Sequence, residues 1–176
     1  MSRSDGDLLI LGIGNVLLGD EGVGVHVVRA LEADAAHAVS AKPLPPQSRV
    51  VDGGTLGLDL LPLINDARAI VFVDAVALGA PAGSMVTLES DRLRAVFAGH
   101  LSVHQVGIGD LLAVAILAGM LPEHVALVGV QPESAEFSLE LSPAVQAVVP
   151  AASRAARAAA WMLHARASSA QPADAS

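Results

Sequence analysis

The sequence contains no cysteine among its 176 residues. This absence excludes disulfide bonds, thiolate metal sites and cysteine nucleophiles, and it fits a reducing cytoplasm, which is the expected location. Basic residues are also few, because ten Lys and Arg stand against eighteen Asp and Glu and give a formal net charge of -8. Without a basic stripe, the chain is expected to bind neither nucleic acid nor an anionic membrane surface.

Apolar runs long enough to span a membrane are also absent, and aromatic residues are few. Residues 1–7 lack the apolar stretch of a signal peptide, and the run 111–121 is too short to span a bilayer, so we expect no membrane insertion. Aromatic residues make up only 2% of the chain, which leaves no obvious aromatic pocket for reading an extended peptide. The 53% of hydrophobic residues is enough for one globular domain with a substantial core.

Apolar runs alternate with segments of helix length along the chain. This pattern is typical of a three-layer α/β domain with a mostly parallel sheet of about five strands and helices on both faces. We expect strands at residues 8–13, 49–51, 69–73, 83–88 and 125–130, with the fourth strand at an edge. Helices are expected at 21–35, 56–64, 107–120 and 142–164, the last one capped by Ser142 and kinked at Pro150. Residues 1–166 form the expected domain, and 167–176 are expected to be a disordered tail.

The turn after the first strand reads Gly-Ile-Gly-Asn-Val-Leu-Leu-Gly-Asp-Glu-Gly-Val-Gly. Gly12 and Gly14 fit the GxGxxG spacing of dinucleotide-binding folds, but Leu17 occupies the place of the third glycine. Asp20 and Glu21 stand where the next helix begins, and their charges would repel the phosphate that such a loop holds. The turn therefore favours a cation as its ligand.

Three residues with metal-binding side chains are expected at one edge of the sheet. Ligands of open α/β sheets bind beyond the carboxyl ends of the strands. Glu21 follows the first strand, Asp74 ends the third, and His104 precedes the helix expected at 107. Two carboxylates and one imidazole would leave open positions on a divalent ion, and this set suits nickel, zinc or manganese.

Each of these residues also has a structural explanation. Asp20 is expected to be the N-cap of the helix that follows it, and for Glu21 capping and chemistry are evenly balanced. Asp74 closes an apolar strand, so its carboxylate needs a partner, which favours function. A single histidine such as His104 is most often a surface or hydrogen-bonded residue.

Other candidates are weaker. His100 is expected to be a surface residue, because Gly99 and Ser102 disfavour a helix that would pair it with His104. Asp52 ends the second strand, where it could bind a ribose hydroxyl or cap the turn that follows it. The sequence has no zinc-protease HExxH pair, no GxSxG elbow and no P-loop, and nothing in the spacing singles out a serine triad.

Five sequence blocks together resemble those of the hydrogenase maturation endopeptidases in order and spacing. The blocks are LGIGN with GDEG (11–15 and 19–22), DGGT (52–55), VDA (73–75), SVHQ (102–105) and GVQPE (129–133). The resemblance covers about residues 7–165. It implies an endopeptidase that removes a C-terminal extension from the large-subunit precursor of a nickel-iron hydrogenase after nickel insertion.

The resemblance also implies roles for single residues. In that family, the residues that match Glu21, Asp74 and His104 form the metal-binding set, and they are the expected catalytic residues here. The expected metal is the nickel of the substrate, although other divalent ions can bind the same set. The pair His104 and Gln105 resembles the branch that serves uptake-type, membrane-associated hydrogenases.

Two alternatives use some of the same residues. A nickel chaperone without catalytic activity would use the same two carboxylates and histidine but would cleave nothing. A nucleotide-binding module would use Gly12, Gly14 and Asp52. The sequence leaves open whether a metal or a carboxylate activates the attacking water.

Overall fold

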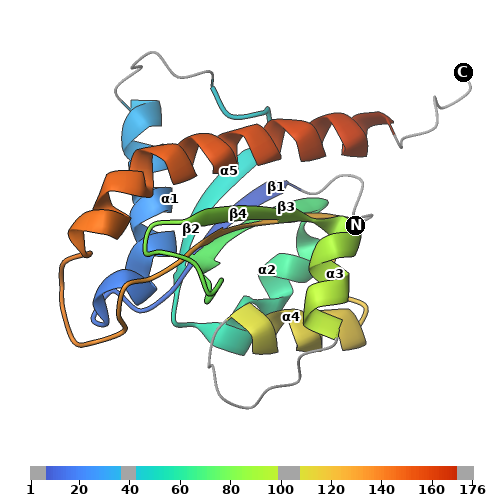
Figure 1. Cartoon of the computed structure of the whole chain (residues 1–176). Helices are drawn as coiled ribbons and strands as arrows, with labels where there is room; N and C mark the ends of the chain where they lie inside the picture. Colours follow the sequence, from blue (N-terminus) through green and yellow to red (C-terminus); the bar gives the residue numbers. More distant parts are fainter. Residues whose placement is uncertain (1–6, 37–42, 99–107, 170–176) are drawn as a thin grey trace, which may run out of the picture.

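The computed structural model describes residues 7–36, 43–98 and 108–169, and its centre is a five-stranded sheet (Figure 1). The strands are β1 (Leu8–Ile13), β2 (Ser48–Gly54), β3 (Ala69–Ala75), β4 (Met85–Glu89) and β5 (His124–Val130). They lie in the order β2-β1-β3-β5-β4, and all neighbouring pairs are parallel except β5 and β4. The carboxyl ends of the four parallel strands therefore share one edge, which we call the C-terminal rim.

Helices cover both faces of the sheet. The helices α1 (Val23–Ala36) and α5 (Pro143–Ser169) lie on one face, and α2 (Leu61–Asp66), α3 (Ser90–Ala98) and α4 (Ile108–Leu117) lie on the other (Figure 1). Two short 3-10 helices, η2 (Gly19–Gly22) and η3 (Gly57–Leu60), precede α1 and α2. Successive residues of β1 point alternately into the two cores. Because both faces are covered, β1 is buried along its whole length, which explains its unbroken apolar sequence.

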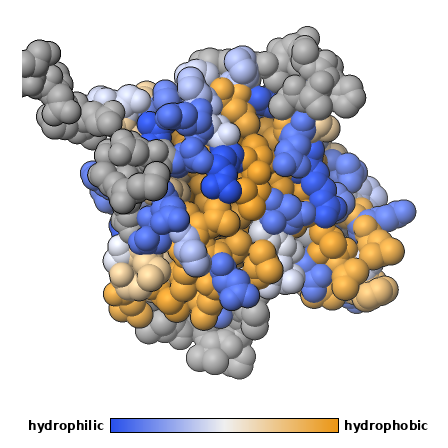
Figure 2. Space-filling model, turned by 180° about the vertical axis from the view of Figure 1, so that it is seen from behind, coloured by the Kyte–Doolittle hydropathy of each residue, from blue (hydrophilic) through white to orange (hydrophobic). Residues whose placement is uncertain are grey.

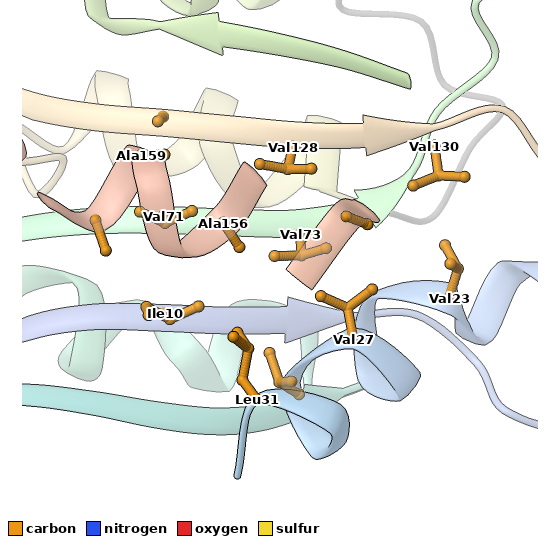
Figure 3. Close-up of a cluster of buried hydrophobic side chains, with 14 of the residues drawn as sticks. Ile10, Val23, Val27, Leu31, Val71, Val73, Val128, Val130, Ala156 and Ala159 are labelled. Atoms are coloured by element: carbon orange, nitrogen blue, oxygen red, sulfur yellow. The ribbon is translucent and has the colours of Figure 1, made fainter. Parts of the chain in front are cut away.

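Small side chains let α5 pack closely on the sheet. Figure 3 shows Ala156 and Ala159 of α5 in one cluster with Val71 and Val128, which come from β3 and β5. Alanine is also the residue with the highest helix propensity. The alanines of α5 therefore stabilise the helix and also allow it to lie close to the sheet. None of the helices in the described residues is long and apolar enough to cross a membrane.

The expected fold class is confirmed. The sheet has five strands, is mostly parallel and carries helices on both faces, and β4 lies at the edge where the fourth strand was expected. Ser142 caps α5 as predicted, since its Oγ accepts a hydrogen bond from the Val145 N–H at 3.3 Å. The helix continues through Pro150, and the kink expected there stays a prediction.

Some boundaries and one helix differ from the expectations. The helix α3 was not predicted, because Leu93 is the one buried residue in its described side chains and such a segment carries little apolar periodicity. Asp74 lies within β3 and not after it. The helix expected to begin at residue 21 is divided into η2 and α1. Residues 167–169, expected to be disordered, continue α5 to Ser169, and 170–176 lie outside the described residues.

The beginning of α1 lies directly against the ends of β1 and β3. A Cβ atom on Gly24 would overlap the carbonyl oxygens of Val73 and Ile13, and one on Gly14 would overlap the carbonyl oxygen of Glu21. Only glycine allows backbones to approach this closely. This packing fixes the position of η2, which carries Glu21, relative to the end of β3, which carries Asp74.

We predict that Gly24→Ala lowers the free energy of unfolding by about 3 kcal/mol or more, because the added methyl group meets backbone atoms that cannot rotate away. Gly79→Ala is the matched control. Gly79 has φ 65° but nothing within 4 Å of the added carbon, so only the backbone strain of about 1 kcal/mol is expected. Urea unfolding of both variants measures the difference, and equal losses would show that the close approach is not rigid.

Candidate functional site

Two carboxylates meet at the C-terminal rim. Asp74 is the sixth residue of β3 and is only 5% exposed, and Glu21 lies in η2 and is partly buried. The two side chains are near enough for the charge of Glu21 to raise the pKa of Asp74. The structure therefore brings together two of the three residues expected to bind a metal.

Asp74 is held by two backbone donors. Its Oδ1 accepts the N–H of Ala75 at 2.8 Å, and its carboxylate also accepts the N–H of Ile108, the first residue of α4. The N-terminus of a helix carries partial positive charge, so this end of α4 favours an anion at Asp74. These contacts orient the carboxylate at the rim.

Burial dominates the electrostatics of the pair. Loss of water contact is the largest cause of the shift that raises the pKa of Asp74 to about 7, and the neighbouring Glu21 adds to it, while the two backbone N–H groups act in the opposite direction. Burial also raises the pKa of Glu21. Both shifts mean that the ionised pair is unfavourable as it stands.

Such a pair can be stabilised by a proton or by a cation. A buried carboxylate next to a second carboxylate loses solvation and gains repulsion, and a divalent ion bound between them removes both costs. Oxygen ligands of this type accept hard and borderline divalent ions. The geometry and charge therefore fit the cation expected from the sequence.

The third expected ligand, His104, lies outside the described residues, as do His100 and Ser102. Within the described residues, no group of three or more His, Cys, Asp or Glu side chains is placed to hold a metal ion. In the sequence, His104 stands four positions before Ile108, whose N–H binds Asp74.

The expectation that Asp20 caps its own helix is wrong. No side-chain cap is found at η2, and Asp20 is 2% exposed with its carboxylate directed to residues more than 100 positions away. Its Oδ1 accepts the N–H of Ser142 at 2.7 Å, and its Oδ2 accepts the Ser142 hydroxyl at 2.8 Å and the Glu133 N–H at 2.8 Å. Three donors satisfy the buried charge, so tertiary contacts replaced the local cap.

Gln131, which belongs to the last sequence block, has a role that the sequence did not reveal. Its Oε1 accepts the N–H of Leu78 at 2.6 Å, and its Nε2 donates to the carbonyl of Pro132 at 3.0 Å. Its backbone pairs with Ser84 and Gly83. The residue thus joins the segment after β3 to the segment after β5 at the rim.

The features that resemble a nucleotide site have structural roles. The space above Gly14, where a phosphate would approach, is filled by the Glu21 backbone. Asp52, the candidate ribose ligand, forms an ion pair with Arg29 at 2.9 Å. These contacts disfavour the nucleotide-binding alternative.

A family model and several known proteins match this chain. The family model of the hydrogenase maturation proteases matches residues 25–159, a range that contains Asp74. The hydrogenase expression/formation protein HupD of Rhodobacter capsulatus is 42% identical over 140 residues, which are 78% of this chain and 63% of that protein. The chain therefore spans less than two thirds of that relative.

Two relatives from Escherichia coli match over more of their length. The hydrogenase 2 maturation protease is 37% identical over 144 residues, or 81% of this chain and 83% of that protein. The solved structure of the hydrogenase maturating endopeptidase HybD superposes with a TM-score of 0.73 at 34% identity, covering 89% of this chain and 93% of that chain.

We predict that Asp74→Asn changes the pH dependence of stability. Since the pKa of Asp74 is raised from 3.8 to about 7, the folded protein keeps a proton between these values that the unfolded chain has lost. The free energy of unfolding therefore falls as pH rises through this interval and levels off above it. Asparagine does not titrate, so Asp74→Asn lacks this decrease. The difference in free energy of unfolding between the variant and the original protein should therefore shift in favour of the variant by a few kcal/mol between pH 4 and pH 8, roughly 1.4 kcal/mol per pKa unit.

Urea unfolding with a chelator present, at several pH values, tests this. Asp52→Asn serves as the control, because that carboxylate is exposed and paired with Arg29. If Asp74→Asn and Asp52→Asn gave the same pH dependence, the buried, destabilised state of Asp74 would be disproved.

Proposed function

Because the chain belongs to the hydrogenase maturation protease family, we propose that it is an endopeptidase that removes the C-terminal extension of a nickel-iron hydrogenase large-subunit precursor after nickel insertion. The observation that carries this proposal is the desolvated pair Glu21 and Asp74 at the C-terminal rim. The names of the E. coli relatives, a hydrogenase 2 maturation protease and a hydrogenase maturating endopeptidase, support it.

Glu21, Asp74 and His104 form the proposed metal-binding and catalytic set. The first two converge in the structure. His104 is four residues before Ile108, whose N–H binds Asp74, and a chain of this length, at most about 14 Å when extended, allows the imidazole to join the two carboxylates. A neutral histidine and two ionised carboxylates then bind one divalent ion and leave further positions open.

The metal in this proposal is the nickel of the substrate. A precursor that already carries nickel would offer the ion with open coordination positions, and the rim carboxylates would bind it there. The buried pair gains its missing positive charge only in that complex, so much of the binding free energy depends on the metal. Zinc or manganese can occupy the same ligands in the absence of substrate.

Catalysis in this account begins with positioning. Binding of the substrate's nickel by Glu21, Asp74 and His104 holds the precursor so that its scissile carbonyl lies beside the site, where a polarised water attacks it. A site that acts only on a held substrate needs no deep pocket for an extended peptide. We place the reaction in the cytoplasm, as expected for a chain without cysteine.

We predict that Asp74→Asn, Glu21→Gln and His104→Ala each abolish processing. Each change removes a proposed metal ligand or its charge. Glu21 and Asp74 lie at the C-terminal rim, so their substitution should leave the fold intact. The mass of the precursor before and after incubation measures processing, and circular dichroism measures folding. Asp52→Asn, an exposed carboxylate at the same end of the sheet, should process normally. Normal processing by all three site variants would refute the site.

We further predict that nickel acts as a checkpoint. The protein should cut nickel-loaded precursor once and should leave casein, short peptides that span the cut site, and nickel-free precursor intact. Efficient cleavage of the nickel-free precursor would refute recognition through the substrate's metal. Tight binding of the loaded precursor without any change in its mass would instead identify a nickel chaperone that uses the same carboxylates.

A further inference from the structure

Large hydrophobic side chains are exposed mainly at the C-terminal rim. Of the seven found exposed in the described part of the chain, six belong to segments at this end of the sheet: Leu17, Leu56, Leu58, Met85, Phe137 and Leu139. The seventh is Leu117, the last residue of α4, which begins at this rim and ends away from it. Figure 2 shows broad hydrophobic areas on the face that is turned away in Figure 1. Single exposed apolar residues are ordinary, but a concentration at a candidate site indicates a binding surface.

Three of these side chains lie together because two segments pair there. Leu18 and Ser138 form a parallel β-bridge, in which the Ser138 N–H donates to the Leu17 carbonyl at 3.1 Å and the Gly19 N–H donates to the Ser138 carbonyl at 2.8 Å. Leu17 directly precedes Leu18, and Phe137 and Leu139 flank Ser138, so the bridge brings the backbones of these three exposed residues close together.

The exposure of these side chains is large. Leu17 is 49% exposed, Phe137 78% and Leu139 67%, whereas Leu18 and Ser138 are partly buried. We call these three exposed residues the rim patch. The patch is next to the carboxylate pair along the chain, because Leu17 is four residues before Glu21.

Asp20 holds the rim patch in place. Its carboxylate accepts hydrogen bonds from Glu133 and Ser142, which stand at the two ends of the segment that carries Phe137 and Leu139. Ser138 adds a local clamp, since its Oγ donates to the Glu140 carbonyl at 2.8 Å. The two adjacent acids therefore differ, because Asp20 fixes this segment, whereas Glu21 lies near Asp74.

The charge around the rim patch indicates the chemistry of its partner. Glu133, Glu136 and Glu140 are exposed in the same segment, and the sequence contains no Lys or Arg from residue 95 to residue 153. A partner surface that complements the rim patch is nonpolar at its centre and basic at its border. Opposite charges around the border of an interface speed association and exclude wrong partners.

We propose that the rim patch docks a nonpolar area, bordered by basic side chains, on the folded body of the hydrogenase large-subunit precursor. This rests on the proposed function and names the surface that brings the substrate to the carboxylate pair. Docking to a folded area explains how a chain with only 2% aromatic residues can select one protein. It also separates recognition of the protein body from recognition of its nickel.

The test uses each nickel-iron hydrogenase large-subunit precursor of the source organism, loaded with nickel. Processing by the double variant Phe137→Ser/Leu139→Ser should show a KM raised about tenfold or more with kcat unchanged within twofold, because these side chains bind substrate without touching the reacting atoms. The Kd for the same precursors without nickel, which the protein should leave intact, is measured by surface immobilisation and should rise by the same factor.

Matched controls separate docking from general effects. Leu117→Ser makes the same chemical change at a leucine that is 82% exposed at the far end of α4, and its KM should stay unchanged. Asp20→Asn replaces one of the two carboxylate oxygens, which together accept three hydrogen bonds, with an NH2 group that cannot accept, so it should raise KM while Asp52→Asn does not. Glu136→Gln/Glu140→Gln should weaken the dependence of KM on salt.

The outcomes decide between the two proposals. An unchanged KM and Kd in the double variant, or an effect on kcat alone, would overturn the docking surface while the endopeptidase stands. If the original protein cuts none of the precursors, the proposed function fails, and the binding assay still decides the docking. Binding that depends on Phe137 and Leu139 would then support the rim patch, and absence of binding would overturn it.

Discussion

The close approach of η2 and α1 to the ends of β1 and β3 determines the geometry of the site. Gly24 lies against the carbonyl oxygens of Val73 and Ile13, and Gly14 lies against that of Glu21. With a Cβ atom at either glycine, η2 would have to move away from the sheet, and Glu21 would leave Asp74. Gly14, one of the two glycines that gave the turn its likeness to a phosphate loop, lies against the Glu21 backbone and so leaves no space there for a phosphate.

The positions of the three rim acids determine how well each carboxylate is stabilised. Asp20 and Glu21 are neighbours in the sequence, yet Asp20 is buried among three hydrogen-bond donors, while no hydrogen bond to the Glu21 carboxylate is found in the described residues. Asp74 has backbone donors, and its charged neighbour is another acid. A fold keeps such a pair at some loss of stability, which is reasonable where a ligand supplies the missing charge. Asp20, whose carboxylate is fully hydrogen-bonded, therefore has a structural role, whereas Glu21 and Asp74 belong to the candidate site.

The sequence predicted those features that depend on local pattern and on the general geometry of parallel sheets. The strands β1 and β3 are buried on both faces, so their apolar runs were unambiguous, and the positions of Glu21 and Asp74 followed from the rule that strand ends share a rim. The role of Asp20 could not be predicted, since its partners Glu133 and Ser142 are more than 100 residues away. The rim patch was missed for a similar reason, because Phe137 lies in a segment without periodicity and acquires its neighbour Leu17 only through tertiary pairing.

The central claim is that Glu21 and Asp74 share one cation at the C-terminal rim. Anomalous diffraction from crystals soaked in nickel at neutral pH locates such an ion directly. The account predicts a peak between the two carboxylates, with each contributing an oxygen at about 2.0–2.2 Å, and its loss in crystals of Asp74→Asn. A peak at another group of side chains that persists in Asp74→Asn, with none between Glu21 and Asp74, would contradict the account.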